Sequence, residues 1–177
     1  MNFLNKFKQY IPSIYNTRYS RELTLRGVEI ELLNLRCNII NGGQISEIFV
    51  SESPHFRCAQ ECIANSKVFR EILYSDNDLI NSILSQNNLI YTKDYINYVK
   101  SAHPETDAIE SLKDFLRLVD AVSTCGVKRK FIFSVLAKRR IGYRAKSNSW
   151  ILIDGLHRSS IFLALNEPSI IARVKFP

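Results

Sequence analysis

Residues 151–160 read Ile-Leu-Ile-Asp-Gly-Leu-His-Arg-Ser-Ser, an apolar run that turns into a polar segment. The run 150–153 is short and wholly apolar, which predicts a buried strand. Residues 155–165 predict a helix that ends at Asn166-Glu167-Pro168, because proline cannot continue a helix. Residues 170–176 alternate apolar and polar side chains as a last strand. We therefore expect a unit close to the smallest βαβ unit at this end of the chain.

The start of the predicted helix concentrates groups that bind anions. The first N–H groups of a helix have no intrahelical acceptor, and the helix dipole is positive there. Gly155 permits close approach of the backbone, while His157, Arg158 and Ser159 add side-chain donors. Asp154 precedes them and is a candidate ligand for a hydrated Mg²⁺ ion. The alternative is that Asp154 only caps the helix and Arg158 is solvated, but so many donors at one helix start favour an anion site.

The turn resembles the ParB/sulfiredoxin superfamily, most closely its ParB-like nuclease-domain branch. That branch carries a strand, a D-G-x-H-R turn, a helix and a closing strand, and the turn here is Asp154-Gly155-Leu156-His157-Arg158. The likeness covers about residues 130–177, with a weaker one over residues 45–55. The helix predicted at 107–124 also fits the order of elements in the family. Residues of about 64–100 match nothing in the family. The resemblance implies an α+β fold in which a small mixed β-sheet is packed with helices.

The resemblance also implies a nucleotide site. In sulfiredoxins the residue before the His-Arg pair is the catalytic cysteine, and Leu156 stands there in this chain. Partition proteins that bind CTP at this turn carry a following helix-turn-helix domain, so we expect neither of these two roles. A further branch is similar to free-serine kinases, and small stand-alone relatives look like products of surface-polysaccharide pathways. We therefore expect a nucleotide-dependent kinase for a small hydroxylated metabolite, with polysaccharide biosynthesis as its setting.

Each part of a kinase has a candidate residue in this interpretation. Gly155, His157, Arg158 and Ser159 would hold the phosphates of ATP or another nucleoside phosphate, and Asp154 would bind Mg²⁺ and take part in catalysis. The expected base is Glu52, which ends the strand before Pro54. Only the likeness in fold places Glu52 near the turn. One alternative is that Glu52 is an ordinary acid whose charge is favourable near a helix start. Another is that the protein senses a nucleotide without turnover, in which case replacing Glu52 would not change its function.

The basic residues suggest a second function. The net charge of +7 suits an anionic partner, and the segment 128–146 contains no acidic residue while its Lys and Arg residues are Lys128, Arg129, Lys130, Lys138, Arg139, Arg140, Arg144 and Lys146. One interpretation is a nucleic-acid-binding or nuclease-like module without kinase activity, in which Phe131, Phe133 and Tyr143 stack on bases. The others are an electrostatic funnel for a phosphorylated substrate and two solvated strand ends.

Length and composition set the organisation. The 177 residues predict one domain at 27–177 with a helical insertion at about 64–105, preceded by an amphipathic helix and connection at 1–26. No run approaches the roughly 20 apolar residues of a membrane span. The N-terminus lacks a signal-peptide core, and four cysteines are too few for a disulfide framework. We therefore expect a cytoplasmic protein with free thiols.

The remaining elements follow from turn and cap signals. We expect strands at 28–35 and 44–51, joined as a hairpin at Asn41-Gly42-Gly43. Further helices are expected at 54–64, 66–75, 77–85, 92–101 and 107–124, and a strand at 131–136. His55, Cys58 and Cys62 share one helical face, which would suit zinc. With no second Cys or His pair nearby in the sequence, we expect the two thiols to be small core side chains.

Overall fold

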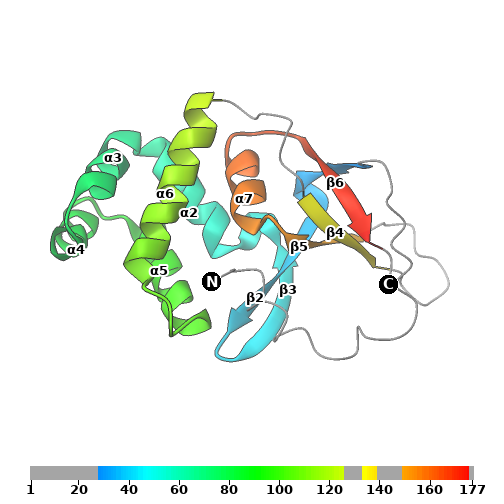
Figure 1. Cartoon of the computed structure of the whole chain (residues 1–177), viewed down its shortest axis with the longest axis horizontal. Helices are drawn as coiled ribbons and strands as arrows, with labels where there is room; N and C mark the ends of the chain where they lie inside the picture. Colours follow the sequence, from blue (N-terminus) through cyan, green and yellow to red (C-terminus); the bar gives the residue numbers. More distant parts are fainter. Residues whose placement is uncertain (1–27, 126–132, 139–148, 176–177) are drawn as a thin grey trace.

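The computed structural model describes residues 28–125, 133–138 and 149–175. Helices and one mixed sheet build this part of the chain, which confirms the α+β class (Figure 1). The elements in chain order are β1 (Val28–Glu31), η2 (Leu32–Asn34), β2 (Leu35–Asn41), β3 (Gln44–Phe49), η3 (Val50–Glu52), α2 (Pro54–Ala64), α3 (Ser66–Tyr74), α4 (Asn77–Gln86), α5 (Ile90–Ala102), α6 (Ala108–Cys125), β4 (Phe133–Lys138), β5 (Ser149–Asp154), α7 (Leu156–Ala164) and β6 (Ser169–Lys175).

The sheet has six strands in the order β1-β6-β4-β5-β2-β3. β2 and β3 form an antiparallel hairpin around Gly42 and Gly43, both of which have positive φ angles. β2 also pairs in parallel with β5, with Cys37 opposite Leu152. β4 runs antiparallel to β5 and parallel to β6, and β1 closes the other edge by antiparallel pairing with β6. The pairing is therefore mixed, as predicted.

The prediction of one strand over 28–35 is wrong. Residues 32–34 form the turn η2, in which Leu32 is fully buried and its N–H donates to the carbonyl of Pro168 at 3.0 Å. The chain thus leaves β1 and enters β2 on the other side of β6, β4 and β5. A flat sheet would separate β1 and β2 by about 19 Å, but the four residue-to-residue steps from Glu31 to Leu35 span at most about 14 Å. The sheet must therefore be strongly curved.

The predicted βαβ unit is also wrong, although its two strands and its helix are present. β4 lies between β5 and β6. Because β4 is antiparallel to β5 and parallel to β6, β5 and β6 run antiparallel to each other. Periodicity reports where strands are, but the neighbour of each strand is set by pairing with distant segments. Here that distant segment is β4, which takes the position beside β5.

The helices lie close to their predicted positions, for reasons visible in their caps. Ser53 caps α2 by accepting from the N–H of Phe56 at 3.2 Å, and Pro54 is the first helical residue. Asp107 accepts from the N–H groups of Ile109 and Glu110 at the start of α6. The predicted helix from Thr92 begins at Ile90 instead, because an acid on another helix, described next, binds its first turn.

Glu61 of α2 caps the start of α5. Its carboxylate accepts from the N–H of Tyr91 at 3.3 Å, from the N–H of Thr92 at 2.8 Å and from the Thr92 hydroxyl at 2.7 Å. These donors have no acceptor within α5, because they belong to its first turn. A carboxylate near a helix N-terminus is also favoured by the helix dipole. This bond therefore fixes α5 against α2, and with it Tyr95, one turn further along.

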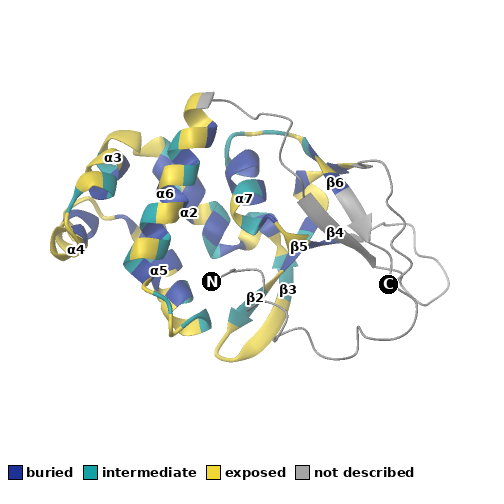
Figure 2. Cartoon of the chain, in the orientation of Figure 1, coloured by how far each residue is buried: buried dark blue, intermediate teal, exposed yellow. Residues whose placement is uncertain are grey.

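The helices cover one side of the sheet (Figure 1). α7 packs on α2, and α2 in turn contacts α5 and α6, so these helices connect the sheet to the outlying α3 and α4. Buried residues of β1, α2, α5, α6, α7 and β6 belong to one hydrophobic core, and Figure 2 colours buried residues dark blue. α4 is largely exposed. In the described residues, no helix is both long and apolar enough to cross a membrane.

Two of the predictions fall on other parts of the chain. The N-terminal helix and connection, residues 1–26, lie outside the described residues. Of the basic segment 128–146, the structure describes only β4, residues 133–138.

The cap of α2 predicts a measurable loss of stability. Ser53 is fully buried, and its hydroxyl also donates to the carbonyl of Val50 at 2.7 Å. Ser53→Ala removes both bonds and should lower the free energy of unfolding by about 1 kcal/mol, measured by urea denaturation. Ser85→Ala, at an exposed position of α4, is the control and should change the free energy by less than about 0.5 kcal/mol. Equal effects of the two substitutions would show that the cap is not stabilising.

Candidate functional site

The start of α7 follows directly on the end of β5. β5 ends at Asp154, and Gly155 then adopts a left-handed backbone with φ of 98°. The first intrahelical bond runs from the N–H of Ser159 to the carbonyl of Gly155 at 2.9 Å. Gly155 has no side chain with which to cap α7, and the N–H groups of Leu156 and His157 have no acceptor within the helix. These donors therefore point beyond the end of the helix.

Asp154 and Arg158 face each other on the first turn of α7. Their charged groups are 3.6 Å apart, and the side chains are 60% and 25% exposed, respectively. An ion pair this accessible to water contributes little to stability. An anion bound at this turn would therefore compete with the largely exposed Asp154 carboxylate for the guanidinium of Arg158.

Ser159 lies elsewhere than the predicted role requires. The residue is fully buried, and its hydroxyl donates to the carbonyl of Leu156 at 3.1 Å. In this arrangement Ser159 closes the first turn of α7 and does not face solvent. Ser160, also fully buried, has a hydroxyl with no hydrogen-bond partner.

His157 lies in an aromatic cluster that the sequence did not reveal. Its Nε2 is 3.3 Å from the hydroxyl of Tyr95 on α5. The imidazole ring is 5.2 Å from the ring of Phe115 on α6 and 4.8 Å from the ring of His55 on α2, measured between centroids. Four helices thus place one aromatic side chain each around the start of α7.

His55, like Tyr95 and Phe115, is buried in this cluster. It is 5% exposed, and edge contacts connect it to the rings of Tyr95 at 5.2 Å and Tyr98 at 5.3 Å. Its Nδ1 has no hydrogen-bond partner. Burial lowers the pKa of His55 well below 6.5, and nearby His157 and His103 lower it further. His55 is therefore a neutral imidazole at pH 7.

His157 is also neutral at pH 7, although the residue is exposed at the surface. The protein around its ring lowers the pKa to about 4, and the positive charge of Arg158 lowers it as well. Solvent at the exposed edge opposes this shift, but an unperturbed histidine is already mostly neutral at pH 7. The side chain of His157 therefore brings no positive charge to this turn.

Glu52 belongs to an element that contacts α7, but its carboxylate binds elsewhere. η3, which contains Glu52, packs against α7. The residue is exposed, and one carboxylate oxygen accepts from the N–H of Phe49 at 3.0 Å. Glu52 also lies close enough to Cys37 to add to the effect of burial, which raises the pKa of that thiol to about 12. The same carboxylate therefore supports the turn that leads into α2.

The cysteines behave as the sequence predicted. Cys37, Cys58 and Cys62 are free and buried. The sulfur of Cys58 lies 3.9 Å from the sulfur of Cys62 and 3.8 Å from the hydroxyl of Thr92, inside the contact of α2 with α5. Among the residues that the structure describes, no cluster of three or more His, Cys, Asp or Glu side chains is arranged to hold a metal ion.

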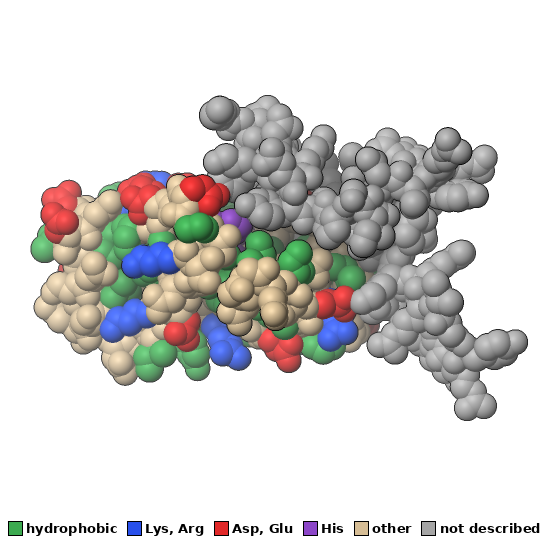
Figure 3. All heavy atoms as spheres, turned by 90° about the horizontal axis from the view of Figure 1, so that it is seen from below, with side chains coloured by type: hydrophobic (Ala, Val, Ile, Leu, Met, Phe, Trp, Pro, Cys, Tyr) green, Lys and Arg blue, Asp and Glu red, His purple; other side chains and the backbone are tan. Residues whose placement is uncertain are grey.

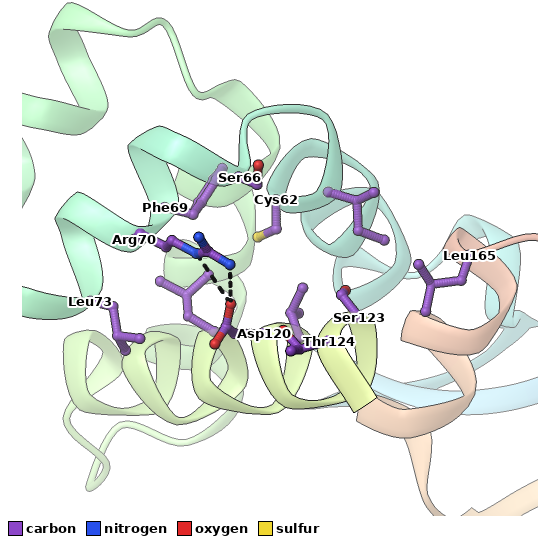
Figure 4. Close-up of a pocket in the computed structure, with 12 residues that line it drawn as sticks. Cys62, Ser66, Phe69, Arg70, Leu73, Asp120, Ser123, Thr124 and Leu165 are labelled. Carbon is purple, nitrogen blue, oxygen red and sulfur yellow. Dashed lines mark hydrogen bonds and ion pairs between the residues drawn. The ribbon is translucent and has the colours of Figure 1, made fainter. Parts of the chain in front are cut away.

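Two surface pockets lie away from the start of α7. One, of about 310 Å³, runs between α3 and α6 and is crossed by the ion pair of Arg70 with Asp120 (Figure 4). The other, of about 350 Å³, lies between the end of β2 and α5 and includes Tyr98. Neither is lined by a residue predicted for the site. Basic and acidic side chains are interspersed on the described surface in Figure 3.

The two buried or enclosed histidines predict how stability depends on pH. Their folded-state pKa values lie below the unfolded value of about 6.5, so the unfolded chain binds more protons as the pH falls below that value. The free energy of unfolding should therefore decrease from pH 7 towards pH 4, by at most about 1.4 kcal/mol per pH unit for each proton. His55→Phe keeps an aromatic ring without a titrating group, so urea denaturation at pH 7, 6 and 5 should give a shallower slope. An unchanged slope in the variant would contradict the assignment.

Comparison with known proteins assigns no family to this chain. No family model, no curated protein and no solved structure matches it. The likeness to the ParB/sulfiredoxin superfamily therefore rests on the residues quoted for it, and the function has to be argued from the geometry at the start of α7.

Proposed function

We propose that the chain binds a nucleoside phosphate at the start of α7 and transfers a phosphoryl group from it to a hydroxyl group of a small metabolite. The observation that carries the proposal is the start of α7, where left-handed Gly155 and the guanidinium of Arg158 lie beside N–H groups that have no acceptor within the helix. Phosphate is the anion best matched to such an end, because several N–H groups and the helix dipole act on it together.

Each residue of the turn then has a physical task. Phosphate oxygens accept from the N–H groups of Leu156 and His157 and from the guanidinium of Arg158, which suits a bidentate contact. Gly155 carries no Cβ, so the backbone can approach the ligand closely. Ser159 supports the turn from inside through its bond to the carbonyl of Leu156.

Asp154 fits a magnesium ion that arrives with the nucleotide. Its carboxylate is exposed and stands at the end of β5, directly before the phosphate-binding turn. Mg²⁺ keeps several water ligands and needs only one or two protein carboxylates when phosphates supply further oxygens. When bound, the ion would neutralise charge on the phosphates. Glu52, on the neighbouring η3, is the base predicted from the sequence, and the structure adds a second candidate that is considered below.

Nucleotide binding is tested by thermal shift with ATP, ADP and CTP, each with and without Mg²⁺. A ligand that binds only the folded chain stabilises it by RT ln(1 + [L]/Kd), about 2.7 kcal/mol at a hundredfold excess over Kd. We expect one nucleotide to raise the melting temperature with Mg²⁺ present, and Arg158→Ala to abolish the increase. Asp154→Ala should remove its dependence on Mg²⁺.

The matched control is Arg57→Ala, which removes an exposed arginine from α2 and should leave the shift intact. A wild-type shift in Arg158→Ala, or no shift with any nucleotide, would contradict the proposed site. A short DNA duplex belongs in the same series because of the basic segment 128–146. A shift with the duplex alone, falling by about 0.9 log units per log unit of salt for each phosphate neutralised, would favour the nucleic-acid function instead.

A further inference from the structure

The three histidines of the chain gather at the start of α7 although they lie far apart in the sequence. His55 begins α2, His103 follows α5 and His157 begins α7. The rings of His55 and His157 are 4.8 Å apart, and His103 is close enough to lower the pKa of both. Phosphate binding does not account for this cluster, because neutral imidazoles add little to the attraction of an anion.

The contacts of His157 are those of an oriented imidazole. The Tyr95 hydroxyl holds Nε2 at 3.3 Å, and the rings of His55 and Phe115 pack against the imidazole. Tyr95 is 1% exposed and Phe115 is 2% exposed, so this side of the site is rigid protein. The residue His157 is nevertheless exposed. Tyr95 engages one ring nitrogen and leaves Nδ1 for another partner.

We propose that His157 accepts the proton of the attacking hydroxyl group, with Tyr95 as its positioning residue. The inference rests on the proposed phosphotransfer. The acceptor oxygen forms a bond to the γ-phosphorus, and the bond from this phosphorus to the bridging oxygen breaks. The nucleoside diphosphate leaves with that electron pair, and the hydroxyl proton moves to Nδ1 of His157. The Nε2–H donates to the oxygen of Tyr95 throughout and fixes the tautomer that presents Nδ1.

His157 fits this task better than Glu52 does. One oxygen of Glu52 is already bound to the N–H of Phe49, whereas His157 belongs to the same turn as the phosphate-binding groups. Burial of its ring and the charge of Arg158 lower the pKa of His157, so the imidazole is unprotonated at neutral pH and can accept a proton. The charged and titratable groups around it are Arg158 and His103, which lower this pKa, Asp114 and Asp154, which raise it, and its ring neighbours His55 and Tyr95.

The test uses the full chain with Mg²⁺ and ATP, and with water or glycerol as the hydroxyl acceptor. His157→Ala should lower phosphate transfer by about a hundredfold or more, in the range typical of a lost general base, while the thermal shift with ATP persists. Added imidazole should restore at least a tenth of the lost activity, because it can take the proton from the vacated position. Arg57→Ala, the exposed control on α2, should retain the activity, and Glu52→Gln is compared in the same assay as the other candidate base.

Each outcome decides the proposal. The proposed role of His157 is overturned if imidazole does not restore turnover to His157→Ala. It is also overturned if turnover depends on Glu52 instead. Neither outcome contradicts nucleotide binding at the start of α7. Absence of any ATP shift in the wild-type chain overturns the proposed function itself. A shift without transfer to water or glycerol overturns phosphotransfer under this proposal and leaves a nucleotide-sensing protein.

A structural measurement supports the test without relying on activity. Long-range ¹H–¹⁵N spectra of the wild-type chain at pH 7 should show His157 as one neutral tautomer with its proton on Nε2. Tyr95→Phe keeps the buried ring but removes the hydroxyl, so it should mix the tautomers, reduce turnover and leave the ATP shift unchanged. A single Nδ1–H tautomer in the wild-type chain would overturn the assignment.

Discussion

The packing of the start of α2 against the start of α7 is the contact on which the candidate site depends. His55 and His157 meet there with their rings 4.8 Å apart, and Tyr95 and Phe115 complete the cluster from two further helices. Because His55 is buried without a partner for its Nδ1, this packing places a polar atom where none is needed for a core. Leaving a buried polar group unsatisfied destabilises a fold, and such positions are often retained for chemistry.

Two tertiary bonds keep the cluster in place. The carboxylate of Glu61 on α2 binds the first turn of α5 and thereby sets the position of Tyr95 one turn later. Leu32 is drawn into the core by η2, whose N–H donor reaches Pro168 after α7. The first bond aligns the helices on each other, and the second ties the loop after α7 to the curved sheet. The two bonds therefore hold α5 against α2 and the segment after α7 against the sheet.

Several features were predictable because their causes are local. Ser53 and Pro54 mark the start of α2, Asp107 marks the start of α6, and Gly155 takes the left-handed backbone that opens α7. Caps and turns involve neighbouring residues, so the sequence contains the whole interaction. The burial of Cys58 and Cys62 was also predicted, because free cysteines without a second Cys or His pair nearby are commonly small core side chains.

The sequence by itself determined the class of the fold, most helix positions and the group of Asp154, Gly155, His157 and Arg158 at one helix start. Only the tertiary structure decided that β4 separates β5 from β6 and that 28–35 is broken at η2. It alone buried Ser159 and brought His55 and Tyr95 to His157. The physical reason is that periodicity and capping act over a few residues, whereas strand order and side-chain contacts between helices depend on segments tens of residues apart.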